Sequence, residues 1–221
     1  MKLGIIKALT IGCFIWAVSL LIWQYRAVLS HQLSVVIPSL NYVYLSDNAE
    51  LLKRYKQANA ERVEWQYLIP PEQRAVIQKY QVPTAMNLAE NILLSINAST
   101  DETYREAMFS TDVVDEWLGK MAYISGFIVP LEIGDNQQLQ SFFFVPYFGA
   151  CTHYPPPPPN KMIYVRVEDS MAIPDLSQAY TIAGEFRGGL YEDMLGTSAY
   201  QLTLVSIEQY NGQPDGFRVH N

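Results

Sequence analysis

Two residues in the C-terminal half of the chain have the types and the spacing that metal binding requires. Cys151 and His153 lie two positions apart in the stretch VPYFGACTHYPPPPPN, residues 145–160. Alternate residues of an extended chain point to the same side, so both side chains can reach one ion. Cysteine sulfur and histidine nitrogen are common zinc ligands. With Glu132 as the expected carboxylate, the sequence predicts a site for zinc or another transition metal at Cys151, His153 and Glu132.

The same pair has two other interpretations, and the residues leave both open. A structural zinc site needs four ligands, and two alone do not make one. Cys151 could instead be a small buried hydrophobe and His153 a backbone-bonded side chain, in a loop with a purely structural role. Alternatively, His153 lowers the pKa of the Cys151 thiol, and the protein is a thiol-dependent redox or hydrolytic enzyme.

Prolines and aromatic residues surround the Cys-x-His pair. Residues 155–159 are all proline, a run that cannot continue a sheet and that favours the polyproline II conformation. Such a run is either a rigid connector, which we favour, or a ligand for an aromatic groove. The predicted binding residues around the pair are Tyr147, Phe148, Pro155, Pro156, Pro157 and Asn160.

The first 29 residues have the composition of a membrane anchor. They contain Lys2, Lys7 and Arg26 but no acidic residue, and residues 8–23 are uncharged. As a helix, residues 8–23 are about 24 Å long, and extension back to Leu3 brings the span close to the thickness of a bilayer core. The bases before the span put the N-terminus in the cytoplasm. We therefore expect a single-pass protein of the bacterial inner membrane with a periplasmic body; a cleaved signal peptide is the alternative.

The charge of the rest of the chain bears on its partners. The 221 residues have a net charge of −7, from 15 basic and 22 acidic residues. Without the three bases of residues 1–29, 12 basic residues remain against the same 22 acidic ones, a net charge of −10. Phosphate backbones repel an acidic body, so nucleic acid is not an expected partner. Two cysteines also exclude a disulfide scaffold.

The segment that follows the anchor, residues 30–115, is predicted to be a helical arm and linker. Pro38 prevents a helix in residues 33–45, which we expect to be extended. Residues 65–71, WQYLIPP, are predicted to be a second extended piece. In the third of the predicted helices, Leu88, Ile92 and Ile96 follow one another at helical spacing. The predicted helices span residues 49–60, 71–79, 85–97 and 99–108, with residues 99–102 as the cap of the last.

Residues 116–211 are predicted to form a β-domain, followed by a tail at 212–221. Apolar residues alternate with period two, and Gly126 interrupts the first run as a bend at a barrel corner would. Between the last two strands, residues 188–196 have room for one helical turn. The fold class is therefore mainly β with a helical N-terminal arm, in which a small five-stranded, partly open barrel of the OB type is preceded by a transmembrane helix; a sandwich is the alternative. The predicted strands span residues 120–132, 139–145, 162–167, 179–186 and 199–210.

Several stretches resemble the signature of a bacterial family, the domain of unknown function three-two-nine-nine. They are GFIVPLE at 126–132, FVPYFGACTH at 144–153, the proline run to Asn160, and the Trp65 to Pro71 element. Residues 199–202 and 205–208 are similar to the last strand of the family. The resemblance covers roughly residues 62–210. It implies an exported or membrane-anchored protein with a small OB-like barrel. The long N-terminal arm and the lack of a lipobox depart from the pattern, which leaves the mode of anchoring open.

The resemblance also implies a role without an established activity. Some family members are associated with export-type ABC transporters and with zinc uptake, which makes metal handling the natural role of Cys151 and His153. We therefore expect a non-enzymatic, membrane-anchored periplasmic accessory protein that binds zinc or docks on an ABC-type transporter. A pure protein-interaction module with a structural Cys-x-His loop is the alternative.

Overall fold

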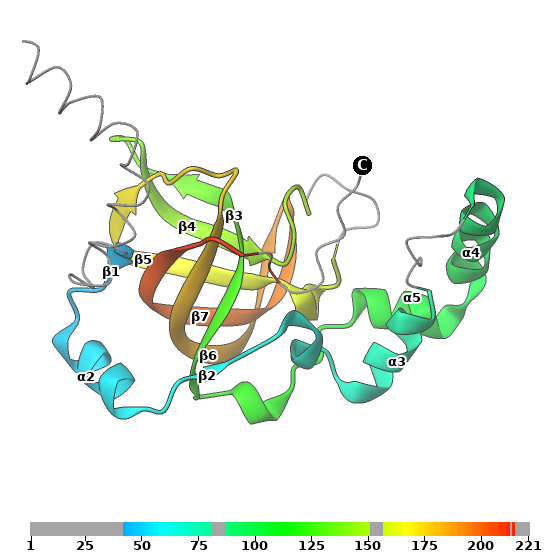
Figure 1. Cartoon of the computed structure of the whole chain (residues 1–221), viewed down its shortest axis with the longest axis horizontal. Helices are drawn as coiled ribbons and strands as arrows, with labels where there is room; N and C mark the ends of the chain where they lie inside the picture. Colours follow the sequence, from blue (N-terminus) through cyan, green and yellow to red (C-terminus); the bar gives the residue numbers. More distant parts are fainter. Residues whose placement is uncertain (1–41, 81–86, 151–156, 213, 215–221) are drawn as a thin grey trace, which may run out of the picture. The chain divides into compact units, whose positions relative to one another are not determined.

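The computed structural model describes residues 42–80, 87–150, 157–212 and 214 (Figure 1). The described residues from Val43 onward form one compact unit. The predicted membrane anchor, residues 1–29, lies outside them. Within the part of the chain that the structure describes, no helix is both long enough and apolar enough to cross a membrane.

Five strands form a barrel in which each strand is hydrogen-bonded to two neighbours, so the ring is closed (Figure 1). The order around the ring is β3-β4-β5-β7-β6 and back to β3; β5 and β7 run parallel, and the other four pairs are antiparallel. The mainly-β class and the five-stranded barrel are thus confirmed, but the barrel is closed and not partly open. The strands are β3 (Met121–Ile133), β4 (Gln138–Val145), β5 (Ile163–Ala172), β6 (Ala179–Asp193) and β7 (Gly196–Tyr210).

Two short strands extend the sheet. β1 (Tyr42–Leu45) pairs with β7, and β2 (Glu61–Arg62) pairs with β3 in parallel. The predicted extended segment 33–45 falls outside the described residues up to position 41, and β1 is its described end. β1 and β2 flank α2 (Ala49–Gln57). Asn48 caps the start of this helix, because its side chain accepts a hydrogen bond from the Leu51 amide.

Gly126 is the corner at which β3 changes partners. Residues 121–126 of β3 pair with β6, and residues from Phe127 onward pair with β4. A Cβ atom at Gly126 would overlap the carbonyl oxygen of Val145 and lie 2.9 Å from the Trp65 ring. The predicted glycine bend is therefore confirmed, and its cause is the close approach of a neighbouring strand and a buried indole.

Large side chains from every strand fill the barrel. Phe142 and Phe144 alternate with Phe143, so two rings enter the barrel core and the third points to the outer side of the barrel, where it is buried in a second cluster. Trp65 closes the core and packs against Phe144 at a ring separation of 5.9 Å. Further core residues are Ile124, Leu139, Ile163, Val165, Ile182, Phe186, Tyr200 and Leu202.

The helical turn predicted between the last two strands is wrong. β6 continues to Asp193, and β7 begins at Gly196. A register shift between Gly188 and Tyr191 bends the hairpin, and Gly196 has a φ of +154° at the turn. Residues 188–196, where one helical turn was expected, therefore continue a long hairpin that contains a bulge.

The arm contains the predicted helices with shifted bounds. α3 (Pro71–Lys79) is as predicted, with Pro71 at its first position. α4 (Leu88–Thr100) begins later than expected because Asn87 and Glu90 form a capping box. The helix also runs through Ser99, and α5 (Glu102–Phe109) is capped by Asp101. The predicted cap at 99–102 therefore starts two residues too early.

The described residues also contain three short 3-10 helices: η2 (Trp65–Leu68), η3 (Asp115–Trp117) and η4 (Pro159–Lys161). The prediction that residues 65–71 are extended is therefore wrong for residues 65–68, which form η2. A 3-10 turn places residues three apart on one side, so Trp65 and Leu68 can both be buried in the core.

Candidate functional site

The Cys-x-His loop leaves the barrel after β4 and returns at η4. Cys151, His153, Pro155 and Pro156 lie outside the described residues, so the predicted metal site is not tested by this geometry. Its two flanks are described. Ala150 is fully buried before the segment, and Pro157 and Pro158 are buried after it. The segment 151–156 therefore starts and ends on anchored residues.

Aromatic residues on the outer surface of the barrel hold the first flank. Ala150 is buried in a cluster with Phe127, Phe143, Val145 and Met162, against which Tyr147 also packs. The Ala150 amide donates a hydrogen bond to the Tyr147 carbonyl at 3.3 Å, across Gly149 with a φ of +73°. Of the predicted binding residues, Tyr147 therefore anchors the loop.

Phe148 lies at the rim of this cluster. Its ring is 54% exposed and meets Phe127 edge-on at 5.9 Å. It is the predicted binding residue whose large apolar surface remains available to a partner.

Asn160 holds the second flank. It is fully buried, and its side-chain amide donates to Gln73 Oε1 at 2.9 Å and to the Asp112 carbonyl at 3.2 Å. Gln73 in turn donates to Ser110 Oγ and Asp112 Oδ2, both at 2.8 Å. The loop is thus tied to α3 and to the segment that follows α5.

A hollow of about 460 Å³ lies next to this hydrogen-bond network, between α3 and α5. Gln73, Ser110 and Asp112 form part of its wall, with two further acidic residues, Glu72 and Glu106. Even so, no three histidine, cysteine or acidic residues among those the structure describes are close enough to hold a metal ion.

Glu132 occupies a different part of the barrel from the start of the loop. It is exposed near the end of β3, opposite Ser141, whose hydroxyl donates to Glu132 Oε2 at 2.9 Å. Val145, where the loop begins, is four residues further along β4, or about 13 Å. Asp112 is the carboxylate next to the second flank of the loop; its sequence neighbours give no signal of this role.

One contact between the arm and the barrel was not predicted from the sequence. It is centred on the hydroxyl of Tyr200, and we call it the Tyr200 clamp. The buried Tyr200 hydroxyl donates to the Leu68 carbonyl at 2.9 Å and accepts from the Val114 amide at 2.6 Å. Burial raises the pKa of Tyr200 to about 12, so the hydroxyl stays protonated at neutral pH. Trp65 Nε1 donates to the Ser125 carbonyl at 2.7 Å. The WQYLIPP element therefore has a structural role.

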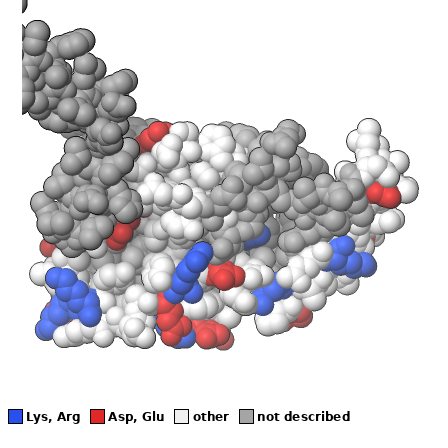
Figure 2. Space-filling model, in the orientation of Figure 1, with Lys and Arg blue, Asp and Glu red and all other residues white. Residues whose placement is uncertain are grey.

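A second candidate site is the exposed apolar face of α4. Leu88 is 76% exposed, Ile92 51%, Leu93 61% and Ile96 53%. The buried residue of α4 is Ala98, on another side of the helix. In Figure 2, the lobe at the position of α4 in Figure 1 is almost free of charged side chains. A cluster of exposed apolar side chains on one helix is characteristic of an interaction site.

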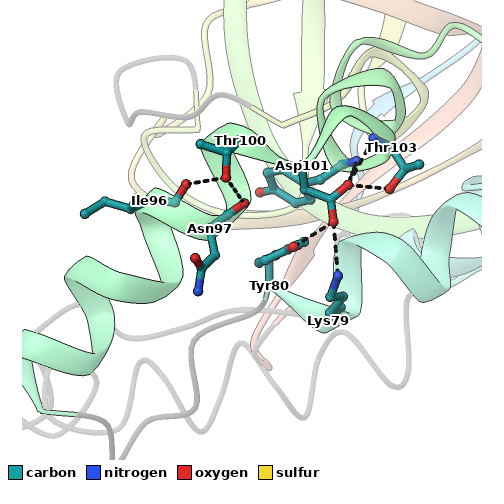
Figure 3. Close-up of polar contacts among 8 residues, drawn as sticks. Lys79, Tyr80, Ile96, Asn97, Thr100, Asp101 and Thr103 are labelled. Atoms are coloured by element: carbon teal, nitrogen blue, oxygen red, sulfur yellow. Dashed lines mark hydrogen bonds and ion pairs between the residues drawn. The ribbon is translucent and has the colours of Figure 1, made fainter.

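Asp101 fixes the junction between α4 and α5 (Figure 3). Its carboxylate accepts from Lys79 Nζ at 3.0 Å and from the Tyr80 hydroxyl at 2.6 Å. It also accepts from the Thr103 hydroxyl and from the amides of Thr103 and Tyr104. The hydrogen bonds from Thr103, Tyr80 and Lys79, in that order, hold the pKa of Asp101 well below its usual value. One carboxylate therefore connects the ends of α3, α4 and α5.

Comparison with known proteins places the chain in a family. The family described as "Protein of unknown function (DUF3299)" matches residues 65–209. A crystal structure of a DUF3299 family protein from Pseudomonas aeruginosa is similar, with 26% sequence identity and a TM-score of 0.51. The match covers 70% of this chain and 99% of that one. No curated protein matches the chain. The protein therefore belongs to the DUF3299 family, whose function is unknown.

Proposed function

We propose that the protein is a non-enzymatic accessory module that docks on a partner protein through its helical arm. The observation that carries the proposal is the apolar face of α4, where Leu88, Ile92 and Ile96 are more than half exposed. Exposed apolar side chains one helical turn apart fit the groove of a protein partner, in which i, i+4 and i+8 residues act as anchors.

The rest of the molecule supports a role for the barrel as a scaffold and for the arm as the docking element. The barrel is closed and its core is filled by side chains, which suits a rigid scaffold. Its five strands and their pairing support an OB-like topology. The Tyr200 clamp and the Asp101 junction hold the arm in a defined conformation, so a docking face on α4 would be preorganised. An anchor at residues 1–29 would place this face at the periplasmic side of the membrane.

Site-specific photo-crosslinking in living cells tests the docking proposal. A photoreactive residue replacing Ile92 should give a discrete protein adduct. The same residue replacing Asn97, which is also exposed on α4 but lies about 140° from Ile92 around the helix axis, should give a much lower yield. Equal yields at the two positions, or no adduct at either, would contradict docking through the apolar face.

A second candidate function is metal binding at Cys151 and His153, with an ABC-type transporter among the possible recipients. It is favoured by the two anchored flanks of the loop, because a segment fixed at both ends loses little further entropy when it binds an ion. The backbone carbonyl of Asp112 accepts from Asn160 at the second flank, which makes the Asp112 carboxylate our candidate third ligand in place of Glu132.

Metal analysis of the purified full-length protein tests this second candidate. We expect about one zinc per chain, lost in Cys151→Ser and His153→Gln but retained in Cys13→Ser, the matched control at the other cysteine. Asp112→Asn and Glu132→Gln then distinguish the two carboxylates. A wild-type protein without stoichiometric metal would end the metal hypothesis and leave the docking proposal intact.

A further inference from the structure

The end of β7 leads into an Asn-Gly pair that the fold leaves exposed. β7 ends at Tyr210, and Asn211 and Gly212 follow it outside any helix or strand, both of them exposed. Neither the Asn211 side chain nor the Gly212 amide is hydrogen-bonded to another of the residues that the structure describes. Residues 211 and 212 are the one Asn-Gly pair of the sequence. The pair therefore has the freedom that a reaction between its side chain and its backbone requires.

The fold restrains the asparagines of the helices and the core much more strongly. Asn48 and Asn87 cap helices, and their side chains accept hydrogen bonds from backbone amides at 3.0 Å. Asn91 and Asn97 lie inside α4, where the helix fixes the backbone around them. Asn160 is fully buried, and its side-chain amide donates two hydrogen bonds. Asn211 thus differs from these residues in its surroundings as well as in the glycine that follows it.

We propose that Asn211 is a site of spontaneous deamidation in the folded protein, a reaction that does not depend on the docking proposal. The Gly212 backbone nitrogen attacks Asn211 Cγ and forms a carbon–nitrogen bond, and the side-chain nitrogen leaves as ammonia with the proton of the backbone amide. The product is a cyclic imide, the succinimide. One water molecule then opens this ring at either carbonyl carbon, which gives aspartate or isoaspartate. The reaction consumes only water and needs no oxidant, cofactor or enzyme.

The Tyr210 ring explains why a glycine stands at position 212. A Cβ atom at Gly212 would lie 2.7 Å from Tyr210 Oη and 2.8 Å from Tyr210 Cζ. A larger residue would therefore have to displace this ring, which packs against the cluster on the outer side of the barrel. The missing Cβ also lets the Gly212 nitrogen approach Asn211 Cγ without hindrance from a side chain. The residue that fits beside Tyr210 is thus also the one that makes the pair reactive.

Deamidation would change the charge of a hollow on this side of the barrel. The hollow has a volume of about 310 Å³, and Phe127, Gln178, Tyr210 and Asn211 form part of its wall. None of its lining residues that the structure describes is charged. Aspartate or isoaspartate at position 211 would add a carboxylate to this wall, and isoaspartate would also insert the side-chain methylene into the main chain. The reaction therefore converts an uncharged hollow into an anionic one.

Peptide mass spectrometry of the folded full-length protein, incubated at mildly alkaline pH, tests the proposal. We expect the amide at position 211 to be lost over time and to be replaced by a mixture of aspartate and isoaspartate. The loss should be faster at higher pH, because the attacking backbone nitrogen must give up its proton. Asn136 is the internal control: it is exposed in the turn between β3 and β4, but Gln137 follows it, so its amide should persist.

Variants of the pair complete the test. On isoelectric focusing, the wild-type protein should develop a more acidic band that runs with Asn211→Asp. Asn211→Gln should not develop this band, and Gly212→Ala should develop it several-fold more slowly. Two results would overturn the proposal: a folded protein that keeps the Asn211 amide under conditions in which the urea-unfolded chain loses it, or equal rates of amide loss at Asn211 and Asn136. The first would show that the fold protects the pair, and the second that glycine at position 212 has no special effect.

Discussion

At the scale of single residues, Gly126 shows how one missing side chain determines the barrel. A Cβ at this position would overlap the Val145 carbonyl and crowd the Trp65 ring, and β3 changes its partner strand here. The space that a Cβ would need is occupied by backbone, which cannot move without breaking the β3·β4 pairing.

Gly126→Ala should therefore lower the free energy of unfolding by about 1–3 kcal/mol, the range for overpacked cores. Gly188→Ala is the matched control in a strand, because its Cβ would meet Leu118 at an ordinary 3.5 Å. Denaturant unfolding of both variants measures the difference. Equal free energies of unfolding for the two variants would show that the backbone near Gly126 can shift to make room for a methyl group.

Tyr200 contributes to stability through a single hydroxyl. Tyr200→Phe should cost about 1–3 kcal/mol, because it leaves the Leu68 carbonyl and the Val114 amide without their side-chain partner. Tyr67→Phe, at an exposed ring, should be nearly neutral. Urea denaturation followed by tryptophan fluorescence provides the comparison, and a neutral Tyr200→Phe would mean that the clamp does not hold the arm.

At the scale of elements, the junction of α3, α4 and α5 depends on one ionised group. The hydrogen bonds to Asp101, first from Thr103 and then from Tyr80 and Lys79, favour its charged form. The pKa of the folded carboxyl therefore lies below the ordinary value of 3.8. On acidification, the unfolded chain binds the proton first, so the contribution is complete above about pH 4 and is lost as the pH falls further.

Asp101→Asn can still cap α5 but cannot titrate, which makes it the test of this junction. The wild-type protein should have the higher thermal midpoint at pH 6, and the gap between the two proteins should narrow towards pH 3. A gap that stays constant over this range would show that the ionisation of Asp101 does not stabilise the junction.

At the scale of the whole molecule, the sequence predicted the pattern of elements better than their connections. Alternating apolar residues located all five barrel strands, and Gly126 marked the corner correctly. The helical turn expected at residues 188–196 is wrong because these residues continue the β6–β7 hairpin, and only the pairing with β7 reveals the register shift between Gly188 and Tyr191. Likewise, local spacing could not reveal that Trp65 and Leu68 enter the core from a 3-10 turn.

The candidate sites differ in how far the sequence could define them. The spacing of Leu88, Ile92 and Ile96 indicated an amphipathic helix, but a helix of this kind normally buries its apolar face in its own domain. Only the structure shows that the face is exposed. The sequence indicates Asn160 as a binding residue because it follows the proline run. Its hydrogen bonds to Gln73 and Asp112 join positions more than 40 residues apart, and no local motif encodes such contacts.

The molecule is thus organised as a closed barrel that fixes an arm, and an arm that presents one uncharged apolar helix face. Polar contacts tie the elements of the arm together at Tyr200 and Asp101, whereas the hydroxyls of Ser95, Ser99 and Thr100 bond to carbonyls within α4 itself. A docking function depends on these junctions, because they determine where the face points.

The most direct test of this account is a photo-crosslinking scan along α4 in living cells. A photoreactive residue is placed in turn at positions 88, 90, 92, 96 and 97, and the yield of protein adduct is measured at each. The account predicts high yields at 88, 92 and 96 and low yields at 90 and 97, following the helical period. Yields that are uniform along the helix, or highest at 90 and 97, would contradict docking through the apolar face of α4.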